Sequence, residues 1–192
     1  MFEKFANELA LNGTIKTEEK GLYIYGLREG LIMLANITTT VFIGILIGMW
    51  WQSVVFLLVY SPLRSFAGGA HAKTHLRCYV LSILLTVVTL FVIKLLPNDT
   101  LINLSISLLA GLIIFFLAPV EDENKPLDEI EVKVYRERTR IILIIELLIT
   151  IILLAIGILE IASCIVVSLA VLAIMLAIGK VKNNLLDLKK RI

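Results

Sequence analysis

Long apolar stretches separated by short polar ones dominate the 192-residue sequence. Six of them follow a polar lead-in, with approximate bounds Leu31–Trp50, Trp51–Leu63, Tyr79–Leu96, Leu101–Pro119, Ile141–Leu159 and Ile161–Gly179. Most approach the length of about 20 residues that an α-helix needs to cross the hydrocarbon core of a membrane. The pattern predicts an all-α, polytopic integral membrane protein with about six hydrophobic segments, one or two of them short or re-entrant, in a single domain over residues 1–192.

The polar stretches around these segments have compositions typical of turns, loops and membrane-surface segments. Leu96–Thr100 (LPNDT) combines Pro, Asn and Asp and predicts a tight turn. Residues 1–30 form a weakly amphipathic lead-in, expected either on the membrane surface or as a cytosolic extension. Residues 120–140 predict a charged loop and residues 180–192 a basic tail, whereas only Glu160 marks the break between the last two apolar stretches.

The composition agrees with a membrane protein. Hydrophobic residues make up 59% of the chain and the mean hydropathy is +0.95, which is more apolar than a water-soluble domain of this size would bury. The net charge of +2 is too small to indicate nucleic-acid binding, so the membrane surface is the expected partner of the basic residues. The two cysteines lack the spacing of a disulfide framework or a metal motif, and Cys164 is expected to be a small buried hydrophobe. No cofactor is expected.

The distribution of Lys and Arg indicates an orientation. If all six segments cross and the N-terminus is cytoplasmic, 17 of the 18 basic residues lie inside and only Lys94 lies outside. This agrees with the positive-inside rule and predicts cytoplasmic N- and C-termini. The chain must then enter and return before Arg64, yet the residues from Leu31 to Leu63 rise only about 50 Å as helix, less than the roughly 60 Å of two crossings. Either the first helix starts earlier and includes Leu22–Gly30, or the second segment is short and partly re-entrant.

Candidate chemistry is concentrated in the segment from Arg64 to Cys78 (RSFAGGAHAKTHLRC). It contains three basic residues, both histidines and one of the two cysteines. Cys78 is expected in the first turn of a helix that starts near Thr74. There the helix dipole and nearby positive charge, including that of Arg77, favour a nucleophilic thiolate.

Two histidines are candidates for the general base that activates this thiol. On one continuous helix His75 would be a direct neighbour of Cys78, whereas His71 would lie about 10.5 Å away along the axis. Gly68 and Gly69, however, indicate non-helical backbone just before His71 and allow a loop that folds it back over the thiol. Spacing therefore leaves both histidines open.

Alternatives to a thiol nucleophile have less support. A zinc site formed by the two histidines and Cys78 is disfavoured because Lys73 would repel a cation, so no metal is predicted. A peptide exporter or transport subunit without catalytic activity would use Arg64 and the histidines only for binding, but no ATP-binding motif supplies its energy. Glu146, an acid within an apolar stretch, is expected to reach the interface or pair with Arg140.

The order and spacing of Arg64, Gly69, His71 and Cys78 resemble the AgrB family. These are integral-membrane cysteine endopeptidases of the accessory gene regulator quorum-sensing systems of Gram-positive bacteria. The stretch Ala118–Glu131 (APVEDENKPLDEIE) resembles the family's proline and asparagine–lysine–proline loop after its fourth hydrophobic segment. Chain length and the number of apolar stretches agree as well, so the resemblance covers nearly the whole chain.

The resemblance implies a reaction. Family members process a precursor peptide, AgrD: the catalytic Cys attacks the carbonyl before the charged C-terminal tail and forms a thioester, and a thiol of the precursor then releases a cyclic thiolactone. By this resemblance Cys78 is the nucleophile, and His71 rather than His75 is the general base and acid. It follows that Gly68–Lys73 is not continuous with the Cys78 helix.

The same resemblance implies supporting roles. Arg64 would bind the peptide tail or stabilise the oxyanion, and Gly69 with Gly68 would let the backbone turn or approach closely. Lys125 and Arg77 are candidates for contact with the substrate. The implied partners are an AgrD-like precursor, the lipid bilayer and a second copy of the chain in a homodimer. The implied location is the cell membrane of a Gram-positive bacterium, with the active site at the cytoplasmic face.

Overall fold

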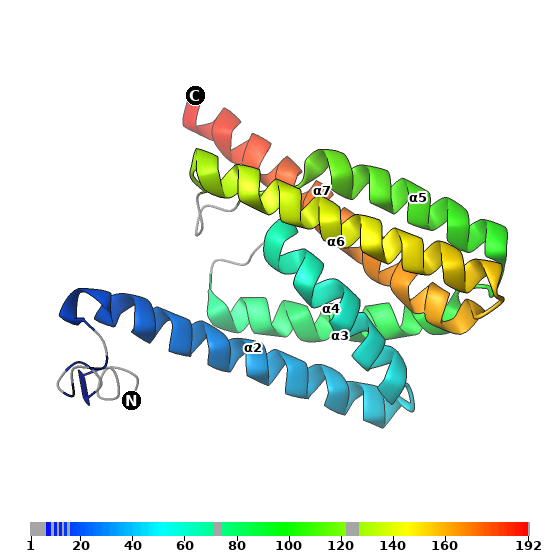
Figure 1. Cartoon of the computed structure of the whole chain (residues 1–192), viewed down its shortest axis with the longest axis horizontal. Coiled ribbons are helices and arrows are strands. Elements are labelled where there is room, and N and C mark those ends of the chain that lie inside the picture. Colours follow the sequence, from blue (N-terminus) through cyan, green and yellow to red (C-terminus); the bar gives the residue numbers. More distant parts are fainter. Residues whose placement is uncertain are drawn as a thin grey trace.

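The computed structural model of the protein describes residues 16–70, 74–121 and 127–191, together with isolated positions between residues 7 and 14. The side chains of Thr17, His75 and several residues close to the C-terminus lie outside this description. The described chain is all-α, as predicted, and forms one 3₁₀ turn and six α-helices (Figure 1). Their bounds are η1 Thr17–Glu19, α2 Lys20–Ile47, α3 Trp50–Ala67, α4 His75–Leu95, α5 Thr100–Leu117, α6 Glu129–Ala155 and α7 Leu159–Arg191.

Four of the described helices are long and apolar enough to cross a membrane. The candidate spans are Lys20–Ile47, Leu76–Leu95, Thr100–Leu117 and Leu159–Leu186. Helix α3 contains several polar residues and the first half of α6 is charged, so these two helices are not in this group. The six predicted segments therefore correspond to six helices, four of which are candidate membrane spans, and the chain is a membrane protein.

Successive helices run in opposite directions, so that their ends collect at two opposite ends of the bundle (Figure 1). The starts of α2, α4 and α6 and the ends of α3, α5 and α7 lie at one end, on the left in Figure 1, which we call the Cys78 end. The start of α3 and the α4–α5 and α6–α7 connections lie at the other, which we call the Trp51 end. The start of the first long helix and the end of the last one thus share one end of the bundle. Their placement on the cytoplasmic side stays a prediction.

The first two long helices show how the chain turns back before Arg64. Helix α2 starts at Lys20, before the apolar stretch, and ends at Ile47, followed by Gly48 in the left-handed conformation (φ 75°). Helix α3 has 18 residues, which rise about 27 Å. The earlier start of the first helix is confirmed, and residues 20–30 of the expected lead-in belong to α2. The other alternative, a short and partly re-entrant second segment, stays a prediction.

The predicted charged loop over residues 120–140 is shorter than expected. Helix α6 begins at Glu129, after a capping box in which Asp128 and Glu131 each accept a hydrogen bond from the other's backbone amide. The charged half of α6 also has a buried face, since Thr139 is only 1% exposed. The loop prediction was wrong for residues 129–140, because a run of charges indicates a solvated face and does not exclude a helix.

The breaks at the Trp51 end are local turns. Asp99 caps α5, with its Oδ1 accepting a hydrogen bond from Ile102 N at 2.9 Å, which confirms the turn predicted at Leu96–Thr100. The break between α6 and α7 lies around Gly157 (φ 80°), whereas the expected marker, Glu160, is in the first turn of α7.

Helix α7 is the most deeply buried helix of the bundle. In an apolar 18-residue stretch of α7, 61% of the residues are buried, compared with 11% in the corresponding stretch of α2. The larger core cluster joins α7 to α3, α5 and α6, and its most buried large side chains are Leu63, Ile114, Leu143, Leu169, Leu172 and Leu176. Cys164 belongs to a second cluster and is 0% exposed, which confirms it as a buried small hydrophobe. This packing places the second half of α7 beside the ends of α3 and α5.

Candidate functional site

Cys78 lies in the first turn of α4, as predicted. The helix begins at His75, directly after Thr74, whose Oγ1 accepts a hydrogen bond from Arg77 N at 3.4 Å. Cys78 N donates to Thr74 O at 3.0 Å and so makes the first backbone bond of the helix. The thiol is free and half-buried, Arg77 on the same turn is exposed, and both stand at the positive end of the helix dipole.

A non-helical turn over Gly68–Ala70 follows α3. Gly68 and Gly69 have φ values of 71° and 113°, in the region that favours glycine. Gly69 N donates to Val120 O, and Val120 N donates to Ala67 O, each at 2.9 Å. The turn therefore pairs with the segment after α5, through an isolated parallel bridge. This confirms the predicted break: α3 and α4 are not one continuous helix.

The guanidinium of Arg64 binds the same turn. Its Nη1 donates to Gly68 O, and its Nη2 donates to Ala70 O at 2.6 Å. Because a guanidinium presents its donors in a rigid planar fork, one side chain near the end of α3 holds two carbonyls of the turn. These contacts support a positioning role for Arg64, while its contacts with a peptide tail or an oxyanion stay predictions.

Tyr60 is a neighbour of the site that the sequence motif did not include. It stacks on Phe56, with ring centroids 5.0 Å apart. Its phenol lies within electrostatic range of both the Arg64 guanidinium and the Cys78 thiol. The available sequence signal was the four-residue spacing from Tyr60 to Arg64, which places both side chains on one face of α3.

Several predicted site residues lie outside the described residues. They are His71, Lys73 and Lys125, together with the side chain of His75. The choice between the two histidines and the zinc alternative therefore stay predictions. Within the part of the chain that the structure describes, no group of three or more His, Cys, Asp and Glu side chains is arranged to hold a metal ion.

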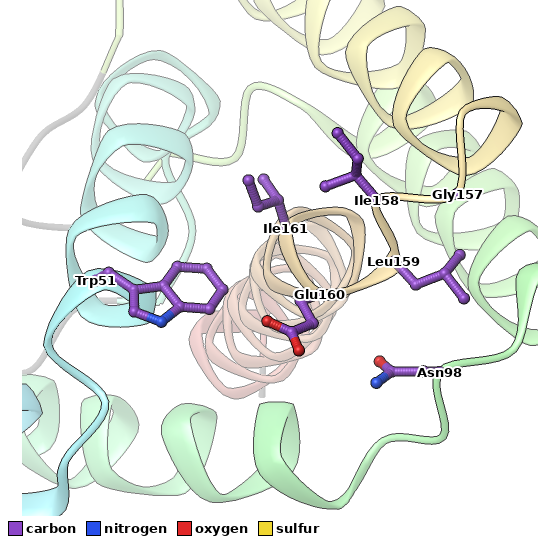
Figure 2. Close-up of a pocket in the computed structure, with 7 residues that line it drawn as sticks. All are labelled: Trp51, Asn98, Gly157, Ile158, Leu159, Glu160 and Ile161. Carbon is purple, nitrogen blue, oxygen red and sulfur yellow. The ribbon is translucent and has the colours of Figure 1, made fainter.

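A cavity of about 510 Å³ lies at the Trp51 end of the bundle. Trp51 from α3, Asn98 from the α4–α5 connection and Glu160 from α7 contribute to its lining (Figure 2). Cys78 and Asn98 stand at opposite ends of α4, whose 21 residues span about 30 Å. The cavity is therefore remote from the candidate nucleophile.

Glu146 is buried, in contrast to the expectation from the sequence. It is 7% exposed, and its Oε2 has no hydrogen-bond partner within the described chain. Arg140, its expected partner, instead places its guanidinium 4.1 Å from the centroid of the Phe115 ring. The expectation of an interfacial or paired carboxylate was wrong because Glu146 lies on the face of α6 that packs into the bundle, together with Leu143 and Thr150.

Comparison with known proteins extends the resemblance over the chain. The family model described as AgrB, Accessory gene regulator B, matches residues 2–176. An AgrB-like protein of Clostridium perfringens Type A is 29% identical over an alignment of 133 residues that covers 65% of this chain and 60% of the relative. An AgrB-like protein of Listeria monocytogenes serovar 1/2a is 31% identical over an alignment of 128 residues that covers 65% of this chain and 62% of the relative.

The chain thus spans less than two thirds of the length of these relatives. No solved structure matches it significantly. The family model nevertheless covers both the Arg64–Cys78 segment and the segment after α5 that pairs with the Gly68–Ala70 turn. On that match over residues 2–176, the chain belongs to the accessory gene regulator B (AgrB) family.

Proposed function

We propose that the protein is a membrane cysteine endopeptidase that removes the C-terminal tail of an AgrD-like precursor peptide and promotes cyclisation of the remainder to a thiolactone. Family membership supports a role in accessory gene regulator quorum sensing. The observation that carries the proposal is the placement of Cys78, a free and half-buried thiol in the first turn of the helix that follows the break at Gly68–Ala70.

Cys78 acts as the nucleophile and His71 as the general base and acid. The thiol proton passes to the imidazole while sulfur bonds to the carbonyl carbon before the tail. The carbon–nitrogen bond then breaks, and the imidazole returns the proton to the leaving amine, which leaves a thioester on Cys78. A thiol of the precursor next attacks the same carbonyl carbon, forms the thiolactone and restores the Cys78 thiol.

The energetics of this scheme set two requirements. Water must be kept from the thioester until the precursor thiol arrives, and the half-buried position of Cys78 supports this. Conversion of an amide to a thioester is unfavourable in free energy. Release of the tail or export of the product must therefore shift the equilibrium towards the product. The later exchange of one thioester for another needs no energy input.

The supporting residues divide between positioning and substrate contact. Arg64, Gly68 and Gly69 position the turn that precedes His71, an assignment supported by the two guanidinium hydrogen bonds and the positive φ values. Arg77 and Lys125 contact the acidic peptide tail. The site lies at the cytoplasmic face of the cell membrane, and the protein acts as a homodimer.

The proposal is tested by co-expressing the chain with a candidate precursor and measuring tail release by mass spectrometry. Cys78→Ala is expected to abolish cleavage. Cys164→Ala is the matched control, because it removes the other thiol from the core, and its folded fraction should keep cleaving. Cleavage by Cys78→Ala would contradict the proposed cysteine endopeptidase.

The same assay identifies the general base. His71→Ala is expected to abolish cleavage and His75→Ala to retain it. The reverse result would make His75 the base, and inhibition by a chelator would favour the alternative of a zinc site.

A further inference from the structure

Two residues of α7, Met175 and Gly179, contact the turn that precedes the candidate base, and a third, Asn183, bonds to the segment after α5. Met175, Gly179 and Asn183 are four residues apart and therefore share one face of the helix, which we call the α7 brace. None of them belongs to the Arg64–Cys78 segment. Gly179 and Asn183 also lie beyond residues 2–176, the part of the chain that the family model matches.

Gly179 touches the backbone of the turn directly. A Cβ at this position would lie 2.7 Å from Ala70 N, 3.0 Å from Gly69 C and 3.1 Å from Gly69 Cα. All three are backbone atoms, so no change of side-chain rotamer would relieve the contact. A glycine inside a helix costs about 1 kcal/mol relative to alanine. Its presence here therefore has a physical reason in the close approach of two backbones rather than in the stability of α7.

The close approach is accompanied by a hydrogen bond. Ala70 N donates to Met175 O, one helical turn before Gly179, at 3.3 Å. Gly69 is part of the same contact, because a Cβ there would lie 3.2 Å from Met175 O and would also meet the guanidinium of Arg64. The turn is thus held between the end of α3 and the backbone of α7.

Asn183 ties the segment after α5 to the same face of α7. Its Nδ2 donates to Glu121 O at 2.7 Å. Glu121 follows Val120, whose carbonyl accepts the hydrogen bond from Gly69 N. The α7 brace therefore contacts the turn directly through Gly179 and indirectly through the segment after α5.

We propose that Gly179 and Asn183 are positioning residues for the reaction proposed above. They hold the Gly68–Ala70 turn against α7, and so fix the position of Ala70, the last residue before the proposed base in the sequence. The inference rests on the proposed function. A displacement of about 1 Å of a catalytic group costs up to about 100-fold in rate, so a methyl group at position 179 acts on the reaction without touching the substrate.

The activity test uses the full chain in lipid vesicles with a synthetic precursor peptide. Gly179→Ala is expected to lower kcat about 10- to 100-fold with KM changed less than about twofold, because the turn moves while the surface that binds the precursor peptide is unchanged. Asn183→Ala, which removes one hydrogen bond from an exposed connection, is expected to lower kcat about three- to tenfold. The matched control is Gly30→Ala, since this helical glycine of α2 has nothing within 4 Å of the added Cβ, and its kcat should equal that of the wild type.

Hydrogen exchange on the same preparations separates positioning from loss of the fold. Gly179→Ala should speed exchange of the Gly69 and Ala70 amides about tenfold or more, because both amides are hydrogen-bonded in this contact, while the amides of α4 and α5 stay protected. Wild-type kcat in both Gly179→Ala and Asn183→Ala would overturn the inference. So would a loss of kcat accompanied by faster exchange throughout the bundle.

Failure of the proposed function would look different. In that case Cys78→Ala would still release the tail, whereas the Gly69 and Ala70 amides would still respond to Gly179→Ala.

Discussion

The two ends of the bundle reverse the chain by different means. At the Trp51 end each described connection is a local turn, made by Gly48, by Asp99 capping α5 and by Gly157. At the Cys78 end, the turn over Gly68–Ala70 takes its hydrogen bonds from the segment after α5 and from α7, far along the sequence. The Trp51 end has a single long-range side-chain hydrogen bond among its described connections, from Ser163 Oγ to Asn98 Oδ1 at 3.4 Å. At the Cys78 end, backbone hydrogen bonds hold three segments in fixed relation, as a proposed catalytic site requires.

The difference is sharpest at two glycines with positive φ. Gly69 (φ 113°) is crowded by Arg64 and by Met175 O, whereas a Cβ at Gly157 (φ 80°) would have nothing within 4 Å. Both Gly→Ala changes carry strain of about 1–3 kcal/mol from the backbone conformation alone. Gly69→Ala is expected to lower tail release about 100-fold or more, because it also displaces the turn. Gly157→Ala should lower the melting temperature and leave the rate per folded molecule unchanged, and equal loss of rate in both would contradict the comparison.

A smaller effect is expected from weakening the guanidinium contact. Arg64→Lys keeps the charge but loses the planar fork that reaches Gly68 O and Ala70 O, so kcat should fall about tenfold, and about 100-fold in Arg64→Ala. The control is Lys94→Ala, which removes an exposed cation from the last turn of α4 at the Trp51 end. An Arg64→Lys rate equal to that of the wild type would show that the charge alone matters.

The smallest effect is expected at the two helix caps. Asp99 caps α5 at 2.9 Å and Thr74 caps the Cys78 helix at 3.4 Å. Replacing either by alanine costs about 1 kcal/mol, and the shorter bond of Asp99 should make its loss the larger one in thermal melts. Thr74→Ala should lower the rate of tail release about two- to threefold, because the turn that carries Cys78 frays, whereas Asp99→Ala should not change it. A loss of rate in Asp99→Ala but not in Thr74→Ala would contradict the expectation that only the cap of the Cys78 helix affects tail release.

The sequence predicted the features that depend on local signals. Apolar stretches of membrane-spanning length predicted six helices, and the pair Gly68 and Gly69 predicted the break before α4. Thr74 and Cys78 lie where the end of the polar segment predicted the helix start. The helix from Glu129 was missed although Asp128 and Glu131 have capping-box spacing, because the surrounding charges were interpreted as a loop.

Features that depend on packing could not be predicted in this way. Gly179 stands in an apolar stretch like other small residues, and only the fold shows that Ala70 N lies against it. The burial of Glu146 was missed for the same reason, since apolar residues surround it in sequence whichever face of α6 packs inward. The Arg64 hydrogen bonds likewise depend on the path of the turn, which motif spacing does not describe.

The central claim is that Cys78 carries the peptide as a thioester. The most direct test is intact-protein mass spectrometry after brief mixing of the chain with a precursor whose own cysteine is replaced by alanine, so that cyclisation cannot release the acyl group. The account predicts an added mass equal to the precursor without its tail, located on the peptide that contains Cys78, removed by hydroxylamine and absent from Cys78→Ala. Stoichiometric tail release without any adduct on Cys78, or with the adduct on another residue, would contradict it.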